Sequence, residues 1–164
     1  DRSPSRGLGD VYKRQFQYHG HVGGIRVYDD YAHHPTEARA VLTAAREVAD
    51  ADAQGLGHPG RVIVCFQPHL FSRTEQFAEE FAKALDLADY AIVLDIYGAR
   101  EKPIPGVTSE LITTQLTIPH KYQPDFSKVP YDVAAIAEPG DIVLTMGAGN
   151  VTMEADAVIA LLKG

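Results

Sequence analysis

The stretch Ile25–Glu37 reads IRVYDDYAHHPTE and joins two different patterns of hydrophobic residues. Its first four residues alternate, which predicts a β-strand, and after Pro35 the apolar residues recur with helical spacing. Two carboxylates, two imidazoles and a phenol therefore lie where a strand gives way to a helix. Ligands of open α/β sheets bind outside the carboxyl ends of the strands, so the stretch is a candidate site.

The rest of the chain repeats this change from strand to helix. Continuous apolar runs, typical of strands covered on both faces, lie at residues 61–66, 90–94 and 142–146. Helical spacing is found at residues 36–49, 72–86, 111–115, 127–137 and 151–162, with a short edge strand expected at 118–122. Ser72, with Glu75 three residues later, predicts a capping box, and Thr108 or Ser109 is the expected cap of the short third helix.

This alternation predicts an α/β fold, namely a Rossmann-like, mostly parallel sheet with helices on both faces. The first two strand patterns, at residues 16–19 and 25–28, are separated by a segment with two glycines at 23 and 24. They predict an antiparallel hairpin at the start of the sheet.

Composition indicates one soluble cytoplasmic domain. The chain has 164 residues, 45% hydrophobic and 23% charged, and its net charge of -7 speaks against a nucleic-acid partner. It has no apolar run long enough for a membrane span, and its first residues lack the apolar core typical of a signal peptide. Its one cysteine, Cys65, is expected to be an inert core thiol. We expect residues 1–15 to be a disordered or non-native leader, with a short strand near Val11 as the alternative, and residues 16–164 to form the domain.

Four polar segments each follow a predicted strand, at residues 29–37, 67–74, 95–101 and 147–152. All parallel strands end at the same edge of a sheet, so we expect these segments to gather in one cleft. The segment Gly147–Thr152 lacks the third glycine and the later acidic residue of a dinucleotide loop, and is more typical of a tight turn. No phosphate loop of the Gly-x-x-x-x-Gly-Lys-Ser/Thr type occurs in the chain.

The histidines and Arg73 admit more than one interpretation. His33 and His34 are adjacent and lack further ligands at short spacing, so a metal site is not expected, and local hydrogen bonding at the helix start is the plain alternative. His69 and Arg73 flank a helix N-terminus, where they could hold a carboxylate or phosphate, although Arg73 could equally be a solvated surface residue. Nucleophilic catalysis has little support, because Cys65 lies within a strand and no Gly-x-Ser-x-Gly motif surrounds Ser72.

Three of these segments together resemble the C-terminal domain of the Mur ligases. The resemblance rests on Asp29–Glu37, Phe66–Thr74 and Asp95–Glu101, with Gly147–Asn150 as a weaker match, and runs in order from residue 16 to the end. The member that joins L-alanine to UDP-N-acetylmuramate is the most similar. The resemblance implies an ATP-dependent, amide-forming ligase of peptidoglycan synthesis, and so of cell-wall biogenesis, cell shape and cell division.

The resemblance also implies which parts are missing. In such ligases one domain holds the UDP-sugar, a central domain holds ATP and Mg²⁺, and the third domain closes over both and positions the amino acid. We therefore expect this chain to contain no catalytic residues of its own, to bind no cofactor alone, and to be inactive as an isolated fragment. UDP-N-acetylmuramate, L-alanine and ATP would be its partners through the missing domains.

Residue roles follow from the matched motifs. The resemblance implies that Asp30, through ribose hydroxyls, and Tyr31 bind nucleotide. It implies substrate contacts for His33, His69, Arg73 and Glu101, with His33 also close to the nucleotide.

The sequence departs from the family pattern at Leu70, where an arginine occurs in related forms, so one basic contact is missing or comes from elsewhere. The alternatives are the ligase that recycles a tripeptide onto the same sugar nucleotide, a stand-alone Rossmann-like binding module, and a metal-dependent hydrolase.

Overall fold

The computed structural model describes residues 16–51, 55 and 57–164. The expected leader, with the alternative strand near Val11, lies outside the described residues. The six strands are β1 (Gln17–Val22), β2 (Ile25–Asp30), β3 (Val62–Phe66), β4 (Tyr90–Leu94), β5 (His120–Gln123) and β6 (Ile142–Met146). The helices are α3 (Pro35–Ala51), α5 (Phe71–Leu85), α6 (Glu110–Thr113), a 3₁₀ turn η1 (Phe126–Lys128), α7 (Val129–Ile136) and α8 (Thr152–Lys163).

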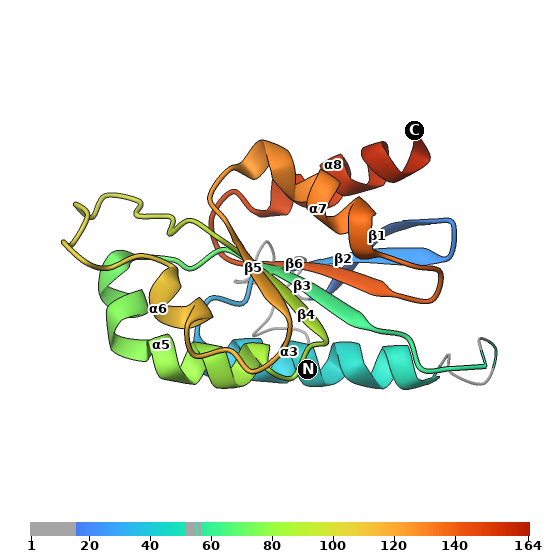
Figure 1. Ribbon diagram of the computed structural model, residues 1–164, viewed down its shortest axis with the longest axis horizontal. Helices are drawn as coiled ribbons and strands as arrows, with labels where there is room; N and C mark the ends of the chain where they lie inside the picture. The colour runs from blue at the N-terminus through green and yellow to red at the C-terminus, as the bar shows by residue number, and fades with distance from the viewer. Residues whose placement is uncertain (1–15, 52–54, 56) are drawn as a thin grey trace, which may run out of the picture.

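The strands form one sheet in the order β1-β2-β6-β3-β4-β5 (Figure 1). β1 pairs with β2 in antiparallel fashion, and every other neighbouring pair is parallel. The predicted α/β fold with an opening hairpin is therefore confirmed. The consequence for function is that β2, β6, β3 and β4 all end at one edge.

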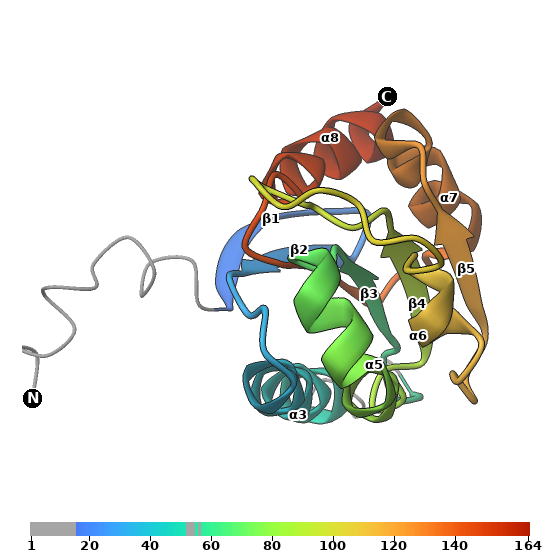
Figure 2. The same cartoon turned by 90° about the vertical axis from the view of Figure 1, so that its left-hand side faces the viewer.

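Helices cover both faces of the sheet, because the buried strands present apolar side chains to both. α3, α5 and α6 lie on one face and α7 and α8 on the other (Figure 2). Along β3, Val64 and Phe66 belong to the α3/α5 core, and Ile63 and Cys65 belong to the α7/α8 core. Cys65 is fully buried, as expected, and burial raises the pKa of its thiol far above the ordinary value.

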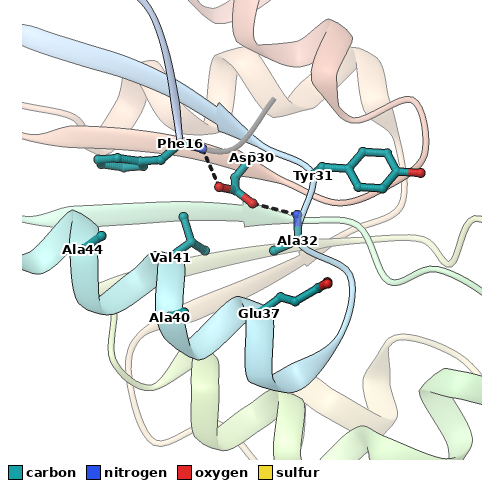
Figure 3. A pocket seen from close by; sticks show the side chains of 8 residues that line it. All are labelled: Phe16, Asp30, Tyr31, Ala32, Glu37, Ala40, Val41 and Ala44. Atoms are coloured by element: carbon teal, nitrogen blue, oxygen red, sulfur yellow. Dashed lines mark hydrogen bonds between the residues drawn. The ribbon is translucent and has the colours of Figure 1, made fainter. Parts of the chain in front are cut away.

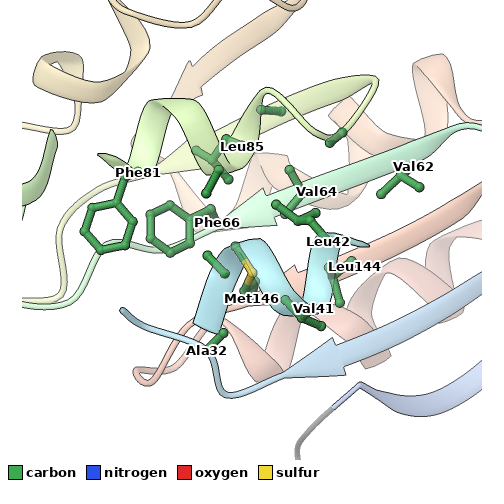
Figure 4. Packing of buried hydrophobic residues seen from close by; sticks show 14 of the residues in the cluster. Ala32, Val41, Leu42, Val62, Val64, Phe66, Phe81, Leu85, Leu144 and Met146 are labelled. Atoms are coloured by element: carbon green, nitrogen blue, oxygen red, sulfur yellow. The ribbon is translucent and has the colours of Figure 1, made fainter. Parts of the chain in front are cut away.

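The larger core lies between the sheet and α3 and α5 (Figure 4). Phe66 of β3 meets Phe81 of α5 with ring centroids 5.1 Å apart. Leu42 of α3 belongs to the same core as Leu144 and Met146 of β6. These contacts fix α3 and α5 on the sheet, and with them the two loops that enter those helices.

The hairpin turn is tighter than predicted. β1 runs on to Val22, which pairs with Ile25, so only Gly23 and Gly24 form the turn. Their φ angles of 60° and 83° are in the left-handed region that suits a two-residue hairpin turn. An added Cβ at Gly24 would lie 3.1 Å from Pro139, so this glycine also allows a close approach.

The predicted capping box at Ser72 is wrong. α5 begins at Phe71, and its N-cap residue, Leu70, has φ 74° and no side-chain cap. Glu101, from the loop after β4, accepts the Ser72 backbone N–H at 3.0 Å and also accepts from the Ser72 hydroxyl. A residue 29 positions away thus replaces the local cap, which spacing along the chain could not indicate.

Two smaller elements are shifted by one or two residues, namely the third helix, predicted at residues 111–115, and the edge strand, predicted at 118–122 and found as β5 (His120–Gln123). The short third helix spans Glu110–Thr113, and the Thr108 hydroxyl oxygen accepts the Glu110 N–H at 3.2 Å, as one of the two expected caps. Ser109 instead donates its hydroxyl hydrogen to the Leu94 carbonyl, because it is buried against β4.

Candidate functional site

The loops after β2, β3, β4 and β6 meet at the carboxyl edge of the sheet, as the sequence predicted. Gly147 donates its N–H to the Asp30 carbonyl at 3.0 Å, which joins the ends of β6 and β2. His69 and Tyr97 form a parallel bridge beyond the ends of β3 and β4. The four polar segments therefore form one surface.

The turn after β6 is held by the protein itself. The Gln67 side chain, 3% exposed, donates to Asn150 Oδ1 at 2.8 Å and accepts the Val151 N–H at 3.1 Å. An added Cβ at Gly149 would lie 2.6 Å from Gln67 Oε1 and 2.7 Å from Tyr97 Cγ. This glycine therefore serves close packing, in agreement with the interpretation as a tight turn.

A buried carboxylate also engages the start of α8. Asp29 accepts hydrogen bonds at 2.8 Å from Thr145 of β6 and at 2.8 Å from Thr152, the first residue of α8. It is fully buried. Asp29 and Gln67 thus accept hydrogen bonds from the Thr152 hydroxyl and the Val151 N–H, which are donors that a phosphate-binding turn would offer to a ligand.

Asp30 is the next residue, and its side chain faces α3. Its Oδ1 accepts the Ala32 N–H at 2.7 Å, and its Oδ2 accepts the Phe16 N–H. Burial raises the pKa of this carboxyl to about 6; these two hydrogen bonds oppose the rise, and the charges of Asp29 and Glu37 add to it. Each carboxylate oxygen keeps further acceptor capacity, so Asp30 can still receive a hydroxyl donor.

A cavity of about 300 Å³ adjoins Asp30 (Figure 3). One wall is the apolar surface of α3, and the other lining residues surround the carboxylate; the full set is Phe16, Asp30, Tyr31, Ala32, Glu37, Ala40, Val41 and Ala44. In Figure 3 the Asp30 carboxylate lies between the Phe16 and Ala32 amides, and the Tyr31 ring points away from it. Such a cavity suits a flat, mostly apolar group that carries hydroxyls.

His33 and His69 come from different loops and face each other. Their ring centroids are 5.7 Å apart at an interplanar angle of 87°, and the Tyr31 ring meets His33 edge-on at 5.2 Å. His33 Nδ1 lies 3.1 Å from the Tyr31 carbonyl oxygen. Because a carbonyl only accepts, this nitrogen donates, and Nε2 of a neutral His33 is left as an acceptor.

His69 and Arg73 are in contact, four positions apart in the chain. Arg73 Nη1 lies 3.1 Å from His69 Nδ1. A guanidinium only donates, so the bond assigns the His69 proton to Nε2. Burial, and then the charges of Arg73 and His33, lower the pKa of His69, whereas Glu101 opposes this effect. His69 is therefore a neutral donor beside a permanent cation, and such a pair suits an anion.

Glu101 is at the rim of this group. Its pKa is lowered first by the hydrogen bond from the Ser72 hydroxyl and then by the Ser72 backbone N–H. Both oxygens thus serve the start of α5, and the charge of Arg73 acts in the same direction. Its expected contact with substrate stays a prediction.

Two residues of this surface did not stand out in the sequence. Tyr97 stacks on His69, and Gln67 ties two loops together. Both lie inside the segments on which the family resemblance rests. Their contacts join loops that follow different strands, and the spacing of residues along the chain does not predict such contacts.

In the part of the chain that the structure describes, no helix is long and apolar enough to cross a membrane. The same residues include no cluster of three or more His, Cys, Asp or Glu side chains that could hold a metal ion.

Comparison with known proteins identifies the family. Residues 14–149 match the model of the Mur ligase glutamate ligase domain. A UDP-N-acetylmuramate–L-alanine ligase of Rhodococcus erythropolis is 56% identical over 160 residues, which cover 96% of this chain and 32% of the relative. The chain thus spans about a third of the length of the curated relatives it matches.

Solved structures show the same fold. The UDP-N-acetylmuramate–alanine ligase of Thermotoga maritima superimposes with a TM-score of 0.70 at 24% identity, over 99% of this chain and 36% of that one. A murein peptide ligase of Psychrobacter arcticus gives 0.71 at 21% identity, over 92% and 30%. With its sequence matched over residues 14–149, the chain belongs to the Mur ligase family, of which it contains the glutamate ligase domain.

Proposed function

We propose that this chain is the amino-acid-positioning domain of an ATP-dependent ligase that joins L-alanine to UDP-N-acetylmuramate in peptidoglycan synthesis. The family match and the relatives at 54% to 57% identity that carry this activity in their names support the proposal. The observation that carries it is the group formed by His33, His69 and Arg73, a cation and two imidazoles at the carboxyl edge of the sheet.

Each side chain has a role that its chemistry allows. Arg73 and the Nε2–H of His69 hold a carboxylate or the acyl oxygen that develops from it. His33, in edge-on contact with His69, offers an acceptor nitrogen beside this anion site, where an amine can be oriented. Tyr31 lines this position beside His33, and Glu101 keeps α5, and so Arg73, in place.

Asp30 is the proposed nucleotide contact. The 300 Å³ cavity beside it combines a carboxylate acceptor with the apolar surface of α3, which fits the ribose hydroxyls and flat base of a nucleoside. In the turn before α8, the Val151 N–H and the Thr152 hydroxyl already bond to Gln67 and Asp29, so this turn does not offer them to a phosphate. We infer that the triphosphate and Mg²⁺ bind mainly to other parts of the parent protein.

ATP, when bound, supplies the phosphoryl group that turns the muramyl carboxylate into an acyl phosphate for attack by the amine of L-alanine. The contribution of this chain is to bind, to orient and to exclude water from that intermediate. This domain alone, without the domains that would bind the UDP-sugar and ATP, cannot enclose that intermediate, so we infer that the isolated chain is inactive.

Phosphate release tests the proposal. The full-length parent should release phosphate only when ATP, Mg²⁺, UDP-N-acetylmuramate and L-alanine are all present, and the 164-residue chain should release none under the same conditions. Turnover by the isolated chain would overturn the inference of an incomplete site, and release by the parent without L-alanine would overturn the proposed acceptor.

The tripeptide-recycling ligase is the second candidate. The TM-scores of 0.71 and 0.70 for a murein peptide ligase and an alanine ligase do not separate the two by fold. The 56% identity to an alanine ligase favours L-alanine. Initial rates of the parent with L-alanine and with the tripeptide L-alanyl-γ-D-glutamyl-meso-diaminopimelate as acceptor decide between them.

A further inference from the structure

Tyr97 contacts His69, one of the proposed substrate-binding residues, but is not itself proposed to bind substrate. Its ring stacks on the His69 ring with centroids 5.6 Å apart and an interplanar angle of 16°. His69 in turn meets His33 edge-on at 5.7 Å. One face of His69 is thus covered by an aromatic ring from the loop after β4.

The backbone of Tyr97 is fixed against the same loop. Its N–H donates to the Pro68 carbonyl at 2.8 Å, and its carbonyl accepts the Leu70 N–H at 2.8 Å. The residues on both sides of His69 are therefore bonded to Tyr97. Leu70 keeps its unfavourable φ of 74° within this arrangement, so the loop holds a conformation that leucine would not choose alone.

The Tyr97 ring is itself held by the turn after β6. An added Cβ at Gly149 would come within 2.7 Å of Tyr97 Cγ and 3.1 Å of Tyr97 Cβ, so the glycine backbone packs directly on this side chain. Tyr97 is 38% exposed, and among the described residues its hydroxyl has no hydrogen-bond partner. The ring, rather than the hydroxyl, makes the contacts.

We propose that Tyr97 is a positioning residue, whose ring fixes the plane of His69 so that Nδ1 meets Arg73 and the Nε2–H points to the substrate. This inference rests on the proposed function of the His69 and Arg73 pair. Loss of the ring frees His69 to rotate about its side-chain bonds, and the donor then spends less time at the reacting position. Tyr97→Phe keeps the ring, Tyr97→Leu removes it, and Tyr131→Leu, at a tyrosine 64% exposed on α7, is the matched control.

The first measurement is the state of the His69 ring in the 164-residue chain. Long-range ¹H–¹⁵N correlation spectra, assigned with His69→Gln, should show the Nε2–H tautomer of His69 in the unsubstituted chain at neutral pH. Tyr97→Leu should give a mixture of tautomers and move the His69 titration upward, whereas Tyr97→Phe and Tyr131→Leu should not. An Nδ1–H or charged His69 in the unsubstituted chain overturns the proposal, even where a variant fails to fold.

The second measurement uses the full-length parent. An aromatic contact of this kind corresponds to about a tenfold effect, so kcat/KM for L-alanine should fall about tenfold in Tyr97→Leu and stay within about twofold in Tyr97→Phe. Equal losses in both variants, or no loss in Tyr97→Leu, overturn the role of the ring. A parent with no ligase activity in any form would instead contradict the proposed function, so the two failures are distinguishable.

Discussion

Glu154 should make the stability of the domain fall as the pH rises from about 4.5 to about 7. It lies in the first turn of α8 but is only 7% exposed, and its Oε1 has no hydrogen-bond partner among the described residues. Burial raises the pKa of its carboxyl from 4.5 to about 7. Glu154→Gln removes the charge and keeps the shape of the protonated side chain.

The sign follows from which state holds the proton. The folded carboxyl has the raised pKa, so folding favours the protonated form; the resulting stability is present below pH 4.5 and is lost as the pH rises to about 7. At about 1.4 kcal/mol per pH unit, the interval between the two values sets an upper limit of roughly 3 kcal/mol. Solvent at the more open oxygen screens part of this, so about 1 to 2 kcal/mol is expected.

The assay is urea denaturation at pH 5 and pH 8. Glu154→Gln should raise the free energy of unfolding by about 1 to 2 kcal/mol at pH 8 and by clearly less at pH 5. Asp30 has a raised pKa as well, but it is present in both proteins and cancels in the difference. Glu47→Gln, at an exposed glutamate of α3, should leave the pH dependence unchanged. If the stability of the unsubstituted chain and of Glu154→Gln changed with pH in the same way, Glu154 would not have the raised pKa expected from its burial.

Two substitutions test how the turn after β6 is built. Gly149→Ala places a Cβ against Tyr97 and the hydrogen-bonded Gln67 side chain, so we expect a loss of about 1 to 3 kcal/mol in urea denaturation, whereas Gly55→Ala, where a Cβ meets nothing within 4 Å, should be nearly neutral. Gln67→Leu leaves the buried Val151 N–H unpaired and should cost about 1 to 3 kcal/mol; an unchanged midpoint would show that the turn does not depend on this amide.

Most of the fold could be predicted from the sequence, because the buried strands are continuous apolar runs that are recognisable without the structure. Residues 90–94 and 142–146 were predicted with the bounds that β4 and β6 have. The start of α5 was predicted wrongly at Ser72, because Glu101 reaches it from another loop. A local sequence pattern predicts only interactions within its own segment, whereas the cap from Glu101 to Ser72 requires the sheet to bring the two loops together.

The candidate site was predictable in its position but not in its internal contacts. Parallel topology was enough to bring His33, His69 and Arg73 to one edge. The stacking of Tyr97 on His69 depends on the separation and twist of β3 and β4, which no spacing in the chain encodes. The burial of Glu154 was not predicted either, because an acidic residue in the first turn of a helix is ordinarily interpreted as a surface charge.

The proposed function depends most on Arg73, which, beside His69, would hold an anionic part of the substrate in an L-alanine-adding ligase. The most direct measurement is kcat/KM of the full-length parent for UDP-N-acetylmuramate and for L-alanine with Arg73→Leu, beside Arg39→Leu at an exposed arginine of α3. We expect kcat/KM to fall about 10- to 100-fold in Arg73→Leu, as for the loss of a hydrogen-bonded charge, and to stay unchanged in Arg39→Leu. An Arg73→Leu parent that turns over like the unsubstituted one would contradict this role of Arg73.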